Sequence, residues 1–254
     1  MNWLTLVVGP FFGAMLAFFS ARMLDGSRRQ RENLASANLA LLTLKNQYND
    51  FLLFRKGFLE DVNRSKLAGD EPLWALVRPT FLTFCSYEFD FKSLGFLFER
   101  PGNTAIFEEV ELVQICHRDL VALEKLRTEQ AVALQSTVAK FQKKNPNPTW
   151  LELEAELGRD VIETVTMIVI GLGIRAEENE NTYLKAFSTL RDALEIEHQS
   201  HWLLNLLNFT FWRNGKPTHI NVKEPLPNFR RAELPKLPTQ LAEAIAKVRP
   251  KNLA

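Results

Sequence analysis

The stretch from about residue 182 to 207 carries the residue types that most often bind metals or move protons. Glu195 and His198 have the Glu-x-x-His spelling of half a di-iron carboxylate site, and His198 and His201 are three residues apart. In a helix this spacing puts both side chains on one face. A complete site needs a second Glu-x-x-His and two further glutamates, and the sequence holds no second copy. We therefore expect no metal, and we interpret His117, on an apolar helix face, as a core histidine.

Arg191 and His198 form the second candidate pair. They stand seven residues apart, about two helical turns, so both should project from one face. The run Arg191-Asp192-Ala-Leu-Glu-Ile-Glu-His198 resembles the Arg-x(4 to 6)-His motif of HEPN domains, four-helix bundles many of which are metal-independent ribonucleases. The resemblance implies that Arg191 and His198 from two protomers would assist attack of the 2′-hydroxyl and stabilise the phosphate. Nucleic acid is a partner only on this interpretation.

A structural alternative explains the same residues. Residues 213–219 have matching Arg and His spacing, although Gly215 and Pro217 prevent a helix there. On the alternative, the motif is part of a solvated stripe in which Arg191 pairs with Glu195 one turn later. We favour this alternative and expect no catalytic residue, with the ribonuclease as the runner-up.

Gly171-Leu-Gly173-Ile-Arg-Ala176 matches the dinucleotide-binding fingerprint in its letters. It follows the β-rich run Thr166 to Ile170, and Glu195 or Glu197 is near the distance expected for a ribose-binding acid. The remaining sequence lacks the alternating strands and helices that a doubly wound domain requires. We expect the glycines to permit close packing in a core segment, and we predict no cofactor. A dinucleotide-binding enzyme is the second alternative to a non-catalytic function.

The N-terminal stretch Trp3 to Ala21 (WLTLVVGPFFGAMLAFFSA) has 19 residues and no charged side chain. As a helix it would cover roughly 28 Å, close to the ~30 Å hydrocarbon core of a bilayer. A cleaved signal would need a basic n-region and small residues before its cleavage site, and a buried core helix is the other alternative. We predict a transmembrane anchor over residues 1–24, crossing once.

Small and basic residues in and after this stretch predict its contacts. A stripe of small residues recurs every fourth position, the pattern that lets transmembrane helices associate. The stripe is Gly9, Gly13, Ala17 and Ala21. Basic residues follow the stretch and none precedes it, which predicts an N-terminus outside and the bulk in the cytoplasm of a bacterial inner membrane. Arg28, Arg29 and Arg31 of this collar, with Arg230 and Arg231 of the tail, are candidate contacts for lipid or a partner.

Composition narrows the function classes. Thirty-one basic and 30 acidic residues leave a net charge of +1, which argues against a nucleic-acid binder charged over its whole surface. Two cysteines, Cys85 and Cys116, cannot build a disulfide framework and fit a reducing compartment.

The remaining sequence predicts an all-α fold with a cytoplasmic bundle of about four long helices over residues 25–212. A heptad seam of apolar residues runs from Leu34 to Val62. We expect this helix to be nearly continuous with the anchor, with a joint at Gly26-Ser27. An aromatic connector over 65–103 follows. Further helices are expected from 103 or 104 to 144 and from about 182 to 207. Between them, a capping box of Thr149 and Glu152 should begin a helix that runs to about residue 175.

Residues 213–254 read as a Pro-rich basic tail with one short helix, Gln240 to Val248. Nine basic residues against three glutamates would let this tail contact anionic lipid or an acidic partner. The alternative is docking onto the bundle through apolar residues. These are Phe229, Leu234, Leu237 and Leu241.

The layout resembles uncharacterised bacterial single-pass proteins with a short anchor, an arginine-rich collar and a cytoplasmic helical domain. Leu39 to Lys56 carries most of the resemblance, and Ser93 to Leu97 adds a little. More distantly it is similar in layout to HEPN-bearing membrane effectors of antiviral systems. We expect a non-catalytic, membrane-anchored interaction or effector protein. It would self-associate through its anchor and contact a protein partner in the cytoplasm. The layout likeness to the antiviral effectors implies a role in antiviral defence.

Overall fold

The structure is a computed structural model. It describes the backbone of residues 3–66, 72–76, 78–79, 84, 87–98, 104–200 and 237–248, and the side chains of these residues except 3–10, 65–66 and 195–200. Within this part of the chain every regular element is a helix, so the all-α prediction is confirmed.

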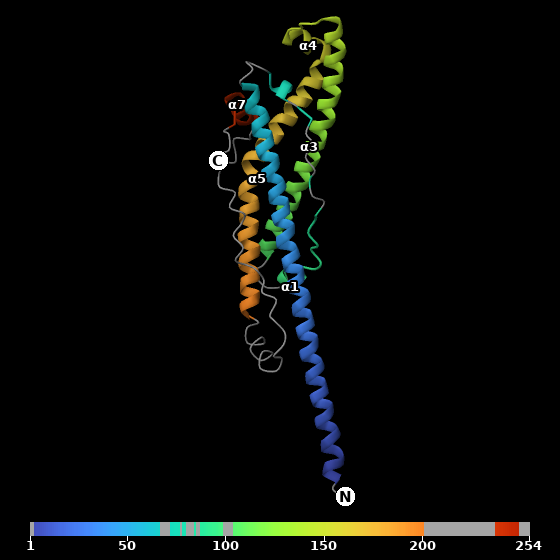
Figure 1. Ribbon diagram of the computed structural model, residues 1–254. Helices are drawn as coiled ribbons and strands as arrows, with labels where there is room; N and C mark the ends of the chain where they lie inside the picture. Colours follow the sequence, from blue (N-terminus) through green and yellow to red (C-terminus); the bar gives the residue numbers. More distant parts are fainter. Residues whose placement is uncertain are drawn as a thin grey trace.

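Helix α1 runs from Trp3 to Lys66 without a break. The predicted continuity of the apolar stretch with the heptad helix is confirmed, without the joint expected at Gly26-Ser27, and the proposed domain boundary at 24/25 falls inside this helix. One glycine costs a helix interior only about 1 kcal/mol relative to alanine, which a helix of this length tolerates. Figure 1 shows the N-terminal part of α1 projecting alone beyond the rest of the molecule.

The predicted heptad seam of α1 faces the core. Ala37, Leu44, Phe51, Phe58 and Val62 are buried. Three leucines beside this seam point away from the bundle. Leu39, Leu42 and Leu53 are 55%, 52% and 55% exposed.

The connector between α1 and the next long helix packs against both of them where the structure describes it. It contains the 3₁₀ helix η1 (Leu73–Leu76) and the short helix α2 (Gly95–Phe98). Trp74 and Phe89 are buried, and the Gln47 side-chain amide donates a hydrogen bond to the carbonyl oxygen of Tyr87 at 2.8 Å. The prediction of a packed connector is confirmed for these segments.

Helix α3 (Thr104–Lys144) begins and ends near the predicted residues. Helix α4 (Trp150–Leu157) begins at the predicted capping box but ends at Leu157, so the predicted end near residue 175 is wrong. The Thr149 hydroxyl accepts from the backbone N–H of Glu152, and the Glu152 carboxylate accepts from the backbone N–H of Thr149 at 2.8 Å. This reciprocal capping box satisfies two N–H groups that the helix itself leaves unpaired. The hydrogen bond from the Thr149 backbone lowers the pKa of Glu152.

Helix α5 runs from Arg159 to Ser200 and replaces two predicted helices. The break expected between about 175 and 182 is wrong, because that segment has neither proline nor glycine and its Asn179 is buried inside the bundle. The chain breaks instead at Gly158, whose φ of 83° is readily adopted only by glycine. The described chain thus has three long helices rather than four. Residues 201–207 lie outside it.

Polar contacts fix the direction of the three long helices, which Figure 1 shows side by side. Gln47 on α1 donates to Gln114 on α3, and Arg127 farther along α3 contacts Asp61 farther along α1, so α1 and α3 are parallel. Helix α5 is antiparallel to α3. Arg175 pairs with Asp119 at 2.8 Å, while Lys185, later on α5, pairs with the earlier Glu109.

Helix α7 (Thr239–Val248) packs against α5. Its start and end confirm the short helix predicted in the tail. Leu241 is fully buried and Leu237 packs against the core, so the docking alternative holds for this part of the tail. Phe229 and Leu234 lie outside the described residues.

Candidate membrane and self-association surface

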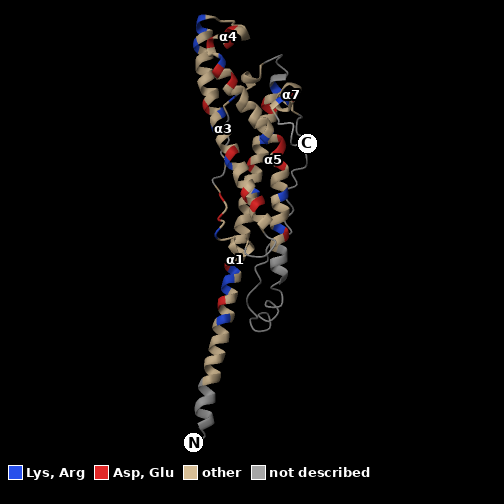
Figure 2. Cartoon of the chain, turned by 180° about the vertical axis from the view of Figure 1, so that it is seen from behind, with Lys and Arg blue, Asp and Glu red and all other residues tan. Residues whose placement is uncertain are grey.

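The described side chains of the projecting part of α1 are all exposed, from Phe11 through Gly26. Phe11 and Leu16 are 65% and 63% exposed. Apolar side chains surround the helix on every side as far as Ala21, and Figure 2 shows this part of α1 free of charge up to the basic collar. A helix that is apolar all round is normally covered by lipid or by other protein segments.

Among the residues whose side chains the structure describes, no helix is both long enough and apolar enough to cross a membrane. That set begins at Phe11, so residues 3–10 of the predicted span lie outside it. The single-pass anchor therefore stays a prediction.

The small-residue stripe is open along its described length. Gly13, Ala17 and Ala21 are exposed, and a Cβ built on Gly13 would meet no atom within 4 Å. Gly9 lies in α1, outside the described side chains. Ala17 and Leu53 are about ten helical turns apart, so the stripe and the exposed leucines lie on one side of the unbroken helix, opposite the core.

Acidic residues partly neutralise the arginine collar. Arg28 pairs with Glu32 at 2.9 Å and Arg29 with Asp25 at 3.0 Å, each one turn apart, and all four side chains are exposed. The hydrogen bond that Arg28 donates to the Glu32 carboxylate raises the pKa of Arg28. Arg31 is exposed as well. The collar thus keeps a net positive charge next to the apolar stretch. Arg230 and Arg231 lie outside the described residues.

The motif pair Arg191 and His198 lies on one uninterrupted helix, α5. Arg191 is exposed and donates from Nε and Nη2 to the Oδ1 atom of Asp192, at 3.1 and 3.0 Å. This contact differs from the predicted pairing with Glu195, whose side chain is outside the description, as is that of His198.

The glycine fingerprint has a packing role. Thr166 to Ile170 is helical, so the strand that a dinucleotide-binding turn must follow is missing at this position. A Cβ at Gly173 would lie 2.8 Å from Cδ1 of Ile245 in α7. Close packing, predicted as the explanation of these glycines, is therefore confirmed for Gly173.

His117 and Cys116 are the candidate metal ligand and the cysteine within the described part of the chain. No group of three or more His, Cys, Asp or Glu side chains there is placed to hold a metal ion. His117 is buried, as predicted for a core histidine, and its Nε2 lies 4.0 Å from Asp50 Oδ2. Burial raises the pKa of the Cys116 thiol, which disfavours the reactive thiolate.

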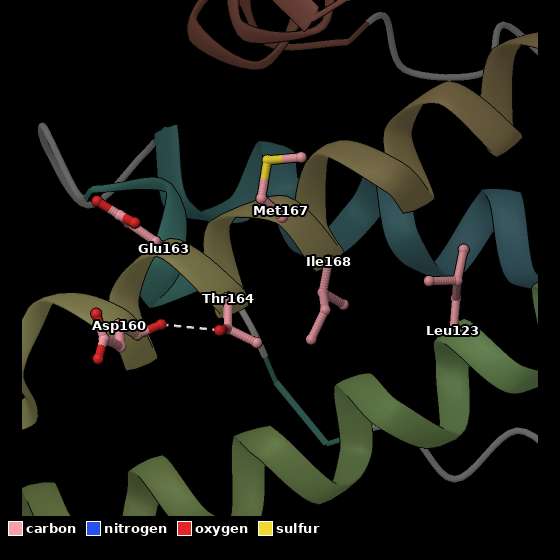
Figure 3. A pocket seen from close by; sticks show the side chains of 6 residues that line it. All are labelled: Leu123, Asp160, Glu163, Thr164, Met167 and Ile168. Carbon is pink, nitrogen blue, oxygen red and sulfur yellow. Dashed lines mark hydrogen bonds between the residues drawn. The ribbon is translucent and has the colours of Figure 1, made fainter.

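An open hollow of about 560 Å³ lies between α3 and the first turns of α5. Figure 3 shows Thr164 and Ile168 pointing from α5 toward α3, while Met167 points the other way. The Thr164 hydroxyl donates to the backbone oxygen of Asp160 at 2.8 Å, and Glu163 is paired with Arg159. The lining offers no nucleophile paired with a base.

Sequence reasoning missed the buried ion cluster between α1 and α3. Arg127 is 1% exposed and donates to Glu124 and to Asp61, both at 3.0 Å. Its guanidinium carbon lies 5.5 Å from the centre of the Phe58 ring. The only signal was the spacing of Glu124 and Arg127 on the apolar side of α3. The cluster joins α1 to α3.

Comparison of the chain with protein-family models, curated proteins and solved structures found no match.

Proposed function

We propose that this chain is a non-catalytic, membrane-anchored interaction protein whose bundle is presented by its own anchor helix. One observation carries the proposal: the apolar stretch has every described side chain exposed and continues as the same helix into the bundle core. Phenylalanine and leucine side chains on all sides of a helix are unfavourable in water, so lipid or other protein segments are expected to cover them. Lipid fits this stretch best, because a basic collar follows it directly.

Self-association belongs to the same proposal. Two copies of the chain inserted into a bilayer with the same orientation have parallel α1 helices. The same residues of the two α1 helices can therefore lie side by side. The stripe of Gly13, Ala17 and Ala21 would let two backbones approach closely. Leu39, Leu42 and Leu53 extend that side of α1 into the cytoplasm and add apolar contact area.

A topology experiment tests the orientation. Alkaline phosphatase fused after Arg31 is expected to be inactive, and a fluorescent protein fused after Ala254 is expected to fluoresce, because phosphatase matures outside the cytoplasm. An active phosphatase fusion together with a dark C-terminal fusion would reverse the proposed orientation. Recovery of the fluorescent fusion in the soluble fraction instead of the membrane fraction would contradict the anchor itself.

A membrane-tethered HEPN-like ribonuclease is the second candidate. It is favoured by the continuity of α5, which keeps Arg191 and His198 two turns apart on one helix. Incubation of the purified chain with RNA in the presence of a chelator separates the two proposals. We expect no cleavage, and we expect His198→Ala to leave any cellular activity unchanged. Metal-independent cleavage abolished by both His198→Ala and Arg191→Ala, with the fold intact, would replace our proposal.

A further inference from the structure

Helix α7 packs against α5 at Gly173, where the lack of a side chain leaves room for residues of α7. We call this contact site on α5 the seat of α7. Leu241 is fully buried and Ile245 is 3% exposed, and these residues stand one turn apart on α7. A Cβ on Gly173 would lie 2.8 Å from Ile245 Cδ1 and 3.3 Å from Leu241 Cδ2. Both side chains of α7 therefore use the space that Gly173 leaves open.

Gly173 lowers the stability of α5 as a helix, and in return it makes room for α7. Glycine weakens a helix interior relative to alanine, and Gly173 lies within the long helix α5. Leu172 and Ile174, its neighbours, are buried and partly buried in the core. The groove therefore lies over packed core and presents a surface complementary to two branched side chains at positions i and i+4.

The chain that joins α7 to α5 is long compared with the distance it must cover. From Gly173 to the end of α5 at Ser200 the helix extends about 40 Å. The 36 residues from 201 to 236 could span up to about 120 Å by chain length alone. The length of the connection therefore does not by itself hold α7 against α5.

We propose that α7 is a displaceable latch on a helix-binding groove of α5 centred on Gly173. When α7 leaves, the groove accepts an amphipathic helix of another protein with branched apolar residues four positions apart. Only Leu241 and Ile245 of α7 are buried apolar anchors, whereas Glu243, Ala246 and Lys247 are exposed, so a partner helix has few contacts to replace. The latch does not depend on the membrane anchor.

A peptide-binding experiment tests the groove in the full-length chain. The probe is a fluorescent peptide with the sequence of residues 237–250, and binding is followed by anisotropy. The double variant Leu241→Asp with Ile245→Asp disables the resident helix without shortening the chain. We expect this variant to bind the peptide at least tenfold more tightly than the wild type, in which the tethered α7 competes. Adding Gly173→Leu should weaken that binding at least tenfold.

Binding of the peptide to neither protein, or equal binding to both, would overturn the latch. Hydrogen exchange of the wild type is a second test, which does not depend on how the variants fold. We expect the amides of α7 to exchange at least tenfold faster than those in the middle of α5, because the latch opens without global unfolding. Exchange of both helices at one rate would overturn the proposal.

Alanine at the seat sharpens the test, because it acts on the two helices in opposite directions. Gly173→Ala strengthens α5 as a helix while placing a methyl group against Ile245. We expect faster exchange in α7 with no increase in α5. Gly57→Ala is the matched control, since a Cβ on Gly57 meets no atom within 4 Å. Equal effects of the two substitutions on α7 would contradict the role of Gly173.

Discussion

Arg127 is the largest fully buried side chain in the described core, and its charge is compensated from two helices. Glu124, one turn earlier on α3, is 2% exposed, while Asp61 on α1 keeps some contact with solvent. Burying a guanidinium is costly unless its donors are paired. The face of Phe58 covers part of the same group. The cluster therefore fixes how α1 and α3 align along their length.

Removal of this guanidinium should destabilise the bundle strongly. Arg127→Met removes the buried positive charge that lies against the Glu124 carboxylate, and we expect the free energy of unfolding to fall by about 3 kcal/mol in urea titration. The double variant Arg127→Met with Glu124→Gln should recover part of that loss, since no buried charge remains. Arg118→Met removes an exposed pair with Glu88 and is the control. A similar small effect for Arg127 and Arg118 would show that the buried cluster has no special weight.

Single residues differ in how far their roles follow from sequence. The capping pair Thr149 and Glu152 was predictable because its contacts are local, three residues apart. The partner of Arg127 on α1 was not, because Asp61 is 66 positions away and only the packing brings it near. Arg191 contacts Asp192, while its predicted pairing with Glu195 stays a prediction because the Glu195 side chain lies outside the description. Two carboxylates compete for this exposed guanidinium, and sequence spacing alone does not choose between them.

At the scale of elements, helix ends could be predicted where side chains mark them, as at both ends of α3 and of α7. The unbroken course of α5 could not be predicted, and the sequence pattern predicts instead one helix ending near 175 and another beginning near 182. A helix continues through polar residues when neighbouring helices bury one of its faces, here including Asn179. The burial of the heptad seam of α1 was also predictable. The exposure of Leu39, Leu42 and Leu53 was not, since it depends on how many helices surround α1.

Helix α1 offers a direct test of self-association through its small-residue stripe. Gly13→Leu adds bulk where two helices would meet, and nothing within 4 Å in the same chain opposes the larger residue. We therefore expect the signal of a self-association reporter built on residues 1–31 to fall several-fold, while helix content is unchanged.

Gly26→Leu is the matched control for this substitution. Gly26 is equally open in the chain, but it lies beyond the apolar stretch and on the other side of the helix. The control should keep the reporter signal. Loss of signal in both variants, or in neither, would remove the stripe from the account.

For the whole molecule, the main consequence of an unbroken α1 is mechanical. No flexible linker separates the apolar stretch from the bundle core, which begins at Ala37. An anchor joined in this way would orient the bundle relative to the bilayer and hold α4 at its far end, as Figure 1 shows for the two ends of the molecule. A protein that orients an interaction surface needs no catalytic centre to act.

Membrane fractionation with alkaline carbonate extraction tests the anchor most directly. The full-length chain should stay in the pellet, and the double variant Phe12→Arg with Leu16→Arg should move to the supernatant with its helical content retained. Each arginine near the centre of a bilayer costs about 3 kcal/mol, and both replaced residues are exposed and outside the bundle. Leu39→Arg, an equally exposed leucine beyond the collar, should stay in the pellet. Release of the unmodified chain by carbonate would contradict the membrane anchor.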